Sequence, residues 1–218
     1  RHTRYGTVTG VQTCALPISG AFAREIASVT LKTRKGDVVI SEDEQPKNAR
    51  PEKIPHLKPA FRDGGTVTPA NSSSISDGAA ALILTTRAHA EANGLPIRAV
   101  IKGQASHAHA PGWFATAPIP AAEKLLKKID WEKDDVDLWE VNEAFASVVL
   151  AWAKTVGADM SRVNPNGGAI SLGHPLGATG CFLTTKAVHE LQRSGGEYAL
   201  ISMCCGGGLG TGTIIQRM

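Results

Sequence analysis

The chain has 218 residues, of which 42% are hydrophobic and 20% charged, an ordinary globular composition that argues against disorder. Its net charge of +3 is too small and too scattered to predict nucleic-acid binding. The longest apolar run, at 78–86, is far shorter than the ~20 residues of a membrane span. Four cysteines, two of them adjacent, do not form a disulfide framework in a chain of this size, so we expect a reducing compartment, the cytoplasm.

The first 19 residues, "RHTRYGTVTGVQTCALPIS", have neither a helical nor a strand period and no signal-peptide layout. They resemble translated sequencing-adaptor sequence, and we expect 1–19 to be a non-native leader. The alternative is a frayed native segment. Residues 20–70 are polar and contain five prolines, which predicts an excursion over a surface with short strand-like pieces such as "DVVI" at 37–40.

The sequence becomes more regular from residue 71 onward. The apolar run at 79–86 predicts a buried strand, followed by a short helix that ends at Gly94. Alternating elements follow and predict a layered α/β domain over roughly 96–218. In chain order these are a strand at 97–105, a helix over about 119–128, a strand at 137–141, a helix at about 143–155, a turn-rich loop at 164–180 opening a helix that Gly195 and Gly196 end, and strands at 198–204 and 210–217.

"VNEAF" places Asn142 where the strand at 137–141 meets the next helix. Asn is among the best residues for a helix N-cap, so capping is one interpretation. A side-chain amide at the carboxyl end of a strand in an α/β sheet also lies where ligands bind. Both interpretations remain open on this motif alone.

"GHPLGATG" at 173–180 surrounds His174 with small residues. A lone loop histidine is usually a surface residue. The glycines on either side allow a substrate or another backbone to approach closely, and the helix that follows offers free N–H groups to developing negative charge.

"CCGGG" at 204–208 offers two thiols before a flexible turn. A buried structural cysteine is the plain interpretation. We expect no metal site, because no second cysteine or histidine pair stands at ligand spacing, and His107 and His109 lack a third ligand. Acid/base or nucleophilic use of a thiol remains.

The three motifs together resemble the thiolase family of acyl-CoA acyltransferases. Asn-Glu-Ala-Phe, Gly-His-Pro-x-Gly-x-x-Gly and Cys-x-Gly-Gly-Gly match it in kind, order and spacing, since 32 residues separate Asn142 from His174 and 30 separate His174 from Cys204. "GTVTPANSSSISDGAAA" at 65–81 resembles the family's CoA-binding segment. The resemblance covers roughly 20–218 and implies the family's αβαβα fold, usually in homodimers or homotetramers.

By resemblance, His174 activates the nucleophilic cysteine and helps form one oxyanion hole, and Asn142 fixes the water that completes that hole. Cys204 is the acid/base, a role that suits a thiol with a reference pKa of about 8.5. The backbone N–H of Gly206 serves the second oxyanion hole. Contacts to CoA are implied for Ser73, Phe145 and Lys47, although Lys47 is equally read as a solvated loop charge. CoA and acyl-CoA are substrates, and no cofactor is implied.

Two departures from the family pattern limit this reading. The nucleophilic cysteine of the family lies in an N-terminal half that we do not find here, and Cys14 lacks the glycine-flanked setting to replace it. The loop that usually reads Met-Gly-x-Gly-Pro reads Phe-Ala-Thr-Ala-Pro at 114–118, so the family's acyl chain length is not carried over.

We therefore expect a C-terminal thiolase fragment that is inactive alone. Its parts are the leader at 1–19, a CoA-binding loop region with the last strand and helix of the N-terminal domain at 20–95, and a complete C-terminal domain at 96–218. Without its partner domain, one sheet face and the strand at 79–86 should be exposed. The rivals are a non-catalytic acyl-CoA-binding or interaction module of this fold and a ketosynthase-type condensing enzyme, which has a histidine where this chain has Cys204.

Overall fold

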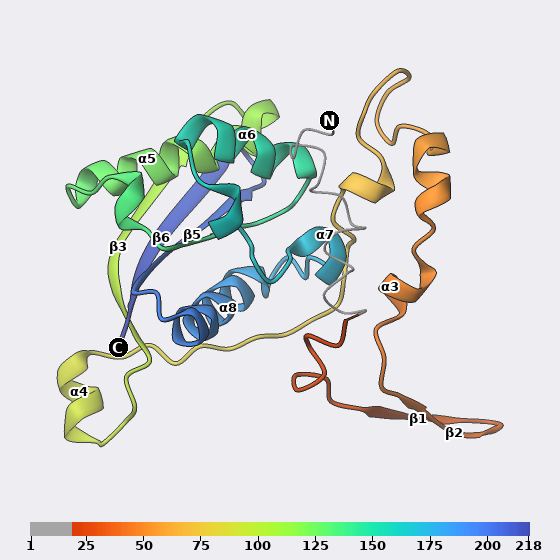
Figure 1. Ribbon diagram of the computed structural model, residues 1–218, viewed down its shortest axis with the longest axis horizontal. Coiled ribbons are helices and arrows are strands. Elements are labelled where there is room, and N and C mark those ends of the chain that lie inside the picture. The colour runs from red at the N-terminus through yellow and green to blue at the C-terminus, as the bar shows by residue number, and fades with distance from the viewer. Residues whose placement is uncertain (1–18) are drawn as a thin grey trace.

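The structure is a computed structural model and describes residues 19–218, without the side chains of Pro46 and Lys47. Figure 1 shows a layered body formed by the C-terminal part of the chain, with the N-terminal part extending beside it. The helices are α3 (Glu44–Asn48), α4 (Arg87–Ala92), α5 (Pro118–Lys128), α6 (Ala146–Val156), α7 (Ala169–Leu172) and α8 (Thr179–Ser194), and the strands are β1 (Val29–Thr33), β2 (Gly36–Ile40), β3 (Ala99–Ala108), β4 (Leu138–Val141), β5 (Tyr198–Cys205) and β6 (Leu209–Arg217).

The body is built on a four-stranded sheet with the order β3-β6-β5-β4. β6 pairs antiparallel with both β3 and β5, whereas β4 and β5 run parallel. The parallel pair requires a crossover, which is supplied by α6, α7 and α8. The β5–β6 hairpin turns through three glycines, and two of them, Gly207 and Gly208, have φ of +85° and +90°, a conformation that favours glycine.

Helices cover both faces of this sheet, so the exposed sheet face that we expected is not found. In Figure 1, α5 and α6 lie on one face of the sheet and α8 lies on the other. The α5 side buries a cluster with Trp139 and Trp152 at its centre, their rings packed edge to face at 5.1 Å. On the other face, Leu183, Ala187 and Leu191 recur at intervals of four along α8 and pack against the sheet. Each fully buried leucine of this kind contributes about 2 kcal/mol through burial.

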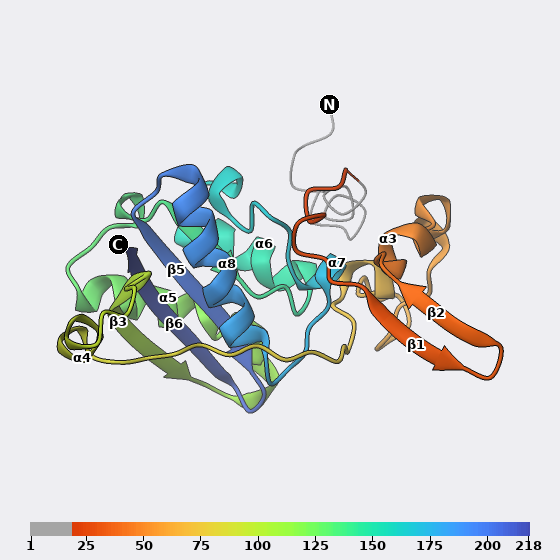
Figure 2. The same cartoon turned by 90° about the horizontal axis from the view of Figure 1, so that it is seen from below.

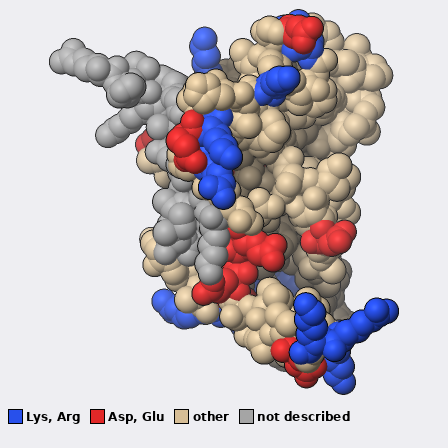
Figure 3. All heavy atoms as spheres, turned by 90° about the vertical axis from the view of Figure 1, so that its right-hand side faces the viewer, with Lys and Arg blue, Asp and Glu red and all other residues tan. Residues whose placement is uncertain are grey.

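The part before the sheet runs over the surface, as expected. β1 and β2 form an antiparallel hairpin in which every residue is exposed, and Figure 2 shows it projecting away from the α/β body. On the side of the molecule that carries these segments, Lys and Arg side chains lie among Asp and Glu (Figure 3).

Two predicted elements differ from the structure. Residues 79–86 are extended but form no strand, and Ile83 and Leu84 are 92% and 72% exposed. A strand needs a neighbour for its N–H and C=O groups, and no described residue pairs with this segment. The exposure that we expected is found; the strand is not. The helix expected from 143 begins at Ala146 and has Phe145 at its N-cap position, so Asn142 is not a helix cap.

The remaining predictions of secondary structure are confirmed to within a few residues. Gly195, with φ +81°, follows the last residue of α8, and Gly94, with φ +63°, lies two residues after the end of α4. Each glycine takes the left-handed conformation that commonly follows a helix.

Candidate active site

The carboxyl ends of β4 and β5 meet at one edge of the sheet. Val141, the last residue of β4, pairs with Ser202, and the Asn142 backbone N–H donates to the Ser202 carbonyl at 2.9 Å. Cys204 lies two residues further along β5. The structure thus brings Asn142 and Cys204 to the end of the parallel strands, where α/β sheets bind ligands.

His174 reaches the same edge from the loop between α7 and α8. Gly173, just before it, has φ +88°, and a Cβ there would overlap the Ser76 side chain. The His174 backbone N–H donates to the Ser74 carbonyl at 3.1 Å. Its ring Nε2 then lies 3.2 Å from Asn142 Nδ2, and both side chains are buried. Two residues that are 32 positions apart therefore meet in one contact.

The partners of His174 assign its tautomer. Thr179 Oγ1 lies 2.9 Å from the Pro175 carbonyl, to which its hydroxyl donates, and 2.7 Å from His174 Nδ1. Because the hydroxyl proton is used on Pro175, Nδ1 carries a proton and donates to Thr179. Nε2 is then the acceptor of the Asn142 amide. Burial lowers the pKa of His174 from its usual 6.5, which favours this neutral ring with a basic Nε2.

Cys204 is a free, buried thiol. Burial raises the pKa of its thiol above the usual range, so the group holds its proton at neutral pH. Alternate residues of β5 face opposite sides of the sheet. Leu200 packs on the α5 side and Ile201 on the α8 side, so Cys204 shares the α5 side and the half-buried Cys205 takes the other.

The predicted CoA contacts Ser73 and Phe145 lie side by side. The Ser73 backbone N–H and its hydroxyl both donate to the Ala144 carbonyl at 3.1 Å. Ser72 bridges to Phe145 and Ile75 bridges to His174. The stretch 72–75 is therefore held between the Asn-Glu-Ala-Phe motif and His174.

For the other predicted site residues, the structure describes no contact with Asn142 or His174. Gly206 lies in the exposed β5–β6 turn, and a Cβ on it would meet no atom within 4 Å, so a ligand has room to approach its backbone. Lys47 belongs to α3, but its side chain lies outside the described residues. Cys14 and the expected leader, except Ser19, also lie outside them.

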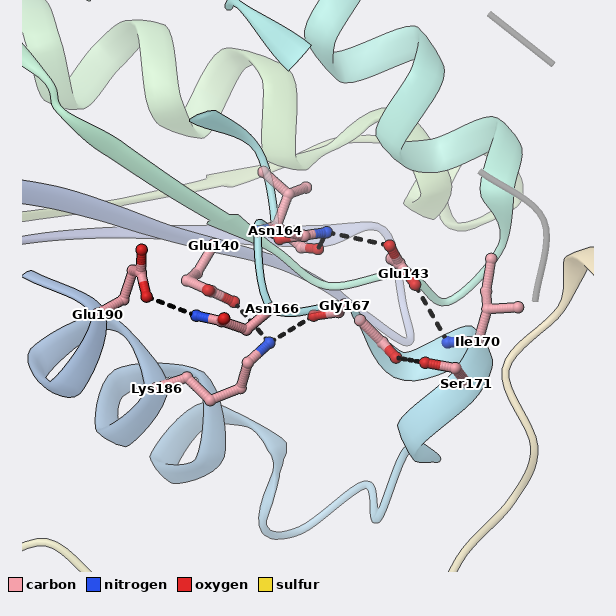
Figure 4. Close-up of polar contacts among 11 residues, drawn as sticks. Glu140, Glu143, Asn164, Asn166, Gly167, Ile170, Ser171, Lys186 and Glu190 are labelled. Atoms are coloured by element: carbon pink, nitrogen blue, oxygen red, sulfur yellow. Dashed lines mark hydrogen bonds and ion pairs between the residues drawn. The ribbon is translucent and has the colours of Figure 1, made fainter. Parts of the chain in front are cut away.

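The sequence interpretation missed a set of buried polar contacts made by Glu140, Glu143 and Lys186, which Figure 4 shows. Glu143 accepts hydrogen bonds from Asn164 Nδ2 and from the Ile170 backbone N–H, each at 3.2 Å. Glu140 pairs with Lys186 Nζ at 3.1 Å, and this ammonium also donates to the Gly167 carbonyl at 2.5 Å. A glutamate inside the otherwise apolar strand "LWEV" is the signal that could have found the ion pair.

Burial is the largest influence on both carboxyls. It raises the pKa of Glu140 and of Glu143 above the usual 4.5. Lys186 opposes this effect at Glu140, while at Glu143 the hydrogen bonds from Ile170 and Asn164 oppose it. Glu143 and Lys186 both hydrogen-bond to the backbone of the loop that delivers His174, at Ile170 and Gly167.

Among residues 19–218, no group of three or more His, Cys, Asp and Glu side chains is arranged to hold a metal ion. No helix in this part is long and apolar enough to cross a membrane. A hollow of about 350 Å³ lies at the end of α5, lined by residues such as Trp131 and Lys133, and none of the predicted site residues lines it.

Comparison with known proteins gives matches over nearly the whole chain. Residues 95–217 match the family model described as the thiolase C-terminal domain, and residues 12–88 match the thiolase N-terminal domain. A mitochondrial acetyl-CoA acetyltransferase of Gibberella zeae is 50% identical over 202 residues, which are 91% of this chain and 46% of that protein. A beta-ketoadipyl-CoA thiolase of Pseudomonas aeruginosa is 44% identical over 92% of this chain and 51% of its own length.

Solved structures agree. A crystal structure of the Bacillus anthracis acetyl-CoA acetyltransferase superposes with a TM-score of 0.87 at 39% identity, covering 100% of this chain and 57% of that one. The human mitochondrial 3-ketoacyl-CoA thiolase gives a TM-score of 0.83 at 36% identity, over 96% of this chain and 54% of its own. The chain spans about half the length of the relatives it matches. Its sequence motifs, its fold and these matches agree, and the chain belongs to the thiolase family.

Proposed function

We propose that this chain carries the C-terminal part of the active site of an acyl-CoA acyltransferase. The reaction is the reversible joining of two acyl-CoA molecules, or the splitting of a 3-ketoacyl-CoA by CoA. The observation that supports it best is the neutral His174 ring held 3.2 Å from Asn142, at the edge of the sheet where Cys204 lies near the end of β5. Relatives at 44–50% identity bear names of such enzymes.

Each group has a role that fits its state. His174 Nε2, with its lone pair free of a proton, takes the proton of a nucleophilic cysteine that lies beyond this chain, and the resulting thiolate attacks the thioester carbonyl. The ring helps form one oxyanion hole, and Asn142 fixes the water that completes it. Cys204 exchanges a proton with the substrate α-carbon or with the CoA sulfur. The Gly206 N–H donates to the second oxyanion.

The CoA arm would lie along the stretch next to Asn142. Ser73 and Phe145 are the proposed contacts to pantetheine, and the Phe145 ring already packs edge to face on Phe61 at 5.9 Å. Lys47 is proposed to meet the phosphorylated ribose. CoA and acyl-CoA act as substrates, with no further cofactor, and the longer protein is proposed to be a cytoplasmic homodimer or homotetramer. One relative is named mitochondrial, so fractionation of the source cells tests the location.

The decisive experiment uses a longer version of the protein that includes its upstream coding sequence. Cys204→Ser should lower thiolysis of acetoacetyl-CoA by about 10²-fold or more, the usual contribution of a positioned acid/base group. The acyl-enzyme should still form and be visible by mass spectrometry. Cys205→Ser is the matched control and should retain its activity. Unchanged turnover in Cys204→Ser would remove this thiol from the mechanism.

The alternative is a non-catalytic acyl-CoA-binding or interaction module of the same fold. It predicts that the longer version binds CoA without acyl-enzyme formation or thiolysis. A glycine-flanked cysteine in the upstream sequence would favour the enzyme.

A further inference from the structure

The loop that delivers His174 is fastened to β4 at its first residue. Asn164 has φ +46°, and its backbone N–H donates to the Trp139 carbonyl at 2.9 Å. Its side chain accepts from the Val141 N–H and donates to the Val141 carbonyl, both at 2.8 Å. The Val141 N–H needs an acceptor, which fixes the orientation of the Asn164 amide and points its second N–H at Glu143.

Glu143 joins the two ends of this loop. One carboxyl oxygen accepts from Asn164 and the other accepts from the Ile170 N–H, six residues later and four before His174. Glu143 is only 2% exposed and follows Asn142 directly. Figure 4 shows its carboxyl reaching from the β4–α6 junction into the loop. Since two donors converge from two directions, only a side chain with two acceptor atoms satisfies both.

Gly168 provides the space for this carboxyl. A Cβ on Gly168 would overlap all three atoms of the Glu143 carboxyl group. The backbone of Gly168 is ordinary extended chain, with φ −137° and ψ −166°, so its conformation alone does not require glycine. Glycine is needed at 168 because the buried Glu143 carboxyl, which accepts two hydrogen bonds, lies against it.

We propose that Glu143 is a positioning residue: its buried carboxyl ties residues 164–170 to the β4–α6 junction and so sets the contact between Asn142 and His174. The importance of that contact for turnover rests on the proposed function. The placement of Glu143 does not, because it follows from hydrogen bonds within this chain. If the Glu143 carboxyl only filled space in the core, replacing Glu143 would leave the tautomer and the pKa of the His174 ring unchanged.

The first test is nitrogen-15 NMR of the histidine rings in the 218-residue chain, with the His174 signals assigned by comparison with His174→Asn. In the unchanged chain we expect a single tautomer with the proton on Nδ1. Glu143→Gln keeps the size but turns one acceptor into a donor that faces an N–H. We expect a mixture of tautomers in this variant and a His174 pKa that rises by about half a unit or more toward 6.5, as water reaches the ring.

Ile215→Val is the matched control, because it loosens the core on the α8 side of the sheet without touching the loop. It should lower the melting temperature by about 2–4 °C and leave the ring signals in place. A folded Glu143→Gln chain with the tautomer and pKa of the unchanged chain would overturn the proposal. Absence of turnover in the longer protein would overturn the proposed function and leave this result standing.

A double-mutant cycle covers the case in which a single variant folds poorly. Gly168→Ala should lower the melting temperature by about 4 °C or more, because its methyl group displaces the Glu143 carboxyl. Glu143→Ala removes that carboxyl, so adding Gly168→Ala to it should cost no further stability. Additive losses in the double variant would mean that Glu143 is not held against Gly168, and the proposal would fail.

Discussion

At the scale of single residues, the candidate site depends on the proton arrangement around His174. Its Nδ1–H is held by Thr179, and its Nε2 is held by Asn142. The first contact selects the tautomer that leaves Nε2 basic. The sequence singled out Asn142 and His174, which the structure brings into contact. It contained no sign of the Thr179 contact, because a hydroxyl at the start of a helix usually serves as a cap.

Thr179→Val should release this tautomer. The variant keeps the side-chain shape but leaves the buried Nδ1–H without an acceptor, which costs about 1–3 kcal/mol of unfolding free energy. Thr184→Val is the matched control, since the Thr184 hydroxyl also donates to a carbonyl four residues earlier, whereas the hydroxyl that contacts His174 Nδ1 is that of Thr179. Urea titration and the ring nitrogen shifts test the pair. Equal losses with unchanged ring signals would contradict the assignment.

The lowered pKa of His174 also predicts a pH dependence of stability. The folded ring binds its proton less readily than the unfolded one, whose pKa is close to 6.5. The contribution of the neutral His174 ring to the free energy of unfolding is therefore fully present above pH 6.5. It is lost as the pH falls through the lower pKa of the folded state. In His174→Asn, the decrease in unfolding free energy at low pH should be smaller by this contribution. An identical pH profile in both chains, measured by urea titration from pH 7.5 to 5, would argue against a buried neutral ring.

Cys204 should react slowly with iodoacetamide. Its thiol is buried and its pKa is raised, whereas Cys181 and Cys205 are partly exposed. Since the thiolate is the reactive form, labelling of Cys204 at pH 7 should lag behind both and should quicken as the pH rises. Peptide mass mapping over time tests this order. Cys204 labelled first would show an accessible or activated thiol.

At the scale of elements, the sequence predicted the alternating strands and helices well because they follow a strong hydrophobic period, and α6 and α8 end at glycines. It failed where an element depends on a partner elsewhere. Residues 79–86 have the composition of a strand, but no described strand pairs with them. α6 begins later than predicted because Phe145 is extended and the side chains of Asn142 and Glu143 are held by His174 and Asn164. The contacts of Glu143 with Asn164 and Ile170, and of Lys186 with the Gly167 carbonyl, could not be predicted because they join the strand–helix junction and α8 to a loop without a period.

Lys186→Met tests how β4 is tied to α8. The variant leaves Glu140 buried without its cation, and we expect a loss of about 3–5 kcal/mol at pH 7. Removing Lys186 raises the pKa of Glu140 further, so the loss should grow as the pH rises through that pKa and shrink toward pH 5. Arg87→Met, which breaks the exposed pair with Glu91, should cost less than about 1 kcal/mol.

Addition of Glu140→Gln to Lys186→Met removes the unpaired charge and should restore part of the loss. Denaturant titration at pH 5 and pH 8 measures all of these variants. If Lys186→Met is no more costly than Arg87→Met, the buried pair does not hold the helix to the strand.

At the scale of the whole molecule, the chain spans about half of its relatives and exposes apolar side chains around residues 79–86. Ile83 and Leu84 are the most exposed of them in this segment. We expect the purified chain to self-associate at micromolar concentration, because exposed apolar patches and unpaired edges promote association. A double Ile83→Ser, Leu84→Ser variant should reduce it, as measured by sedimentation velocity. If the variant and the unchanged chain associate equally, the surface that mediates self-association does not include Ile83 and Leu84.

The same chain is expected to lack thiolysis activity, since the cysteine that would carry the acyl group is proposed to lie beyond it. Acetoacetyl-CoA, CoA and the purified 218-residue chain should give no acetyl-CoA above the uncatalysed rate. Cleavage that grows with chain concentration and survives further purification would overturn this prediction.

The stretch 72–75 has a consequence for how ligand binding would be detected. The Ser73 N–H is bonded to Ala144, and the Ser74 carbonyl receives the His174 N–H. Opening of this stretch therefore releases both amides in one event, and they should exchange hydrogen with solvent together. A CoA molecule that binds only the closed stretch would slow both exchange rates by one common factor. Hydrogen exchange can thus report binding at Ser73 through an amide that belongs to His174.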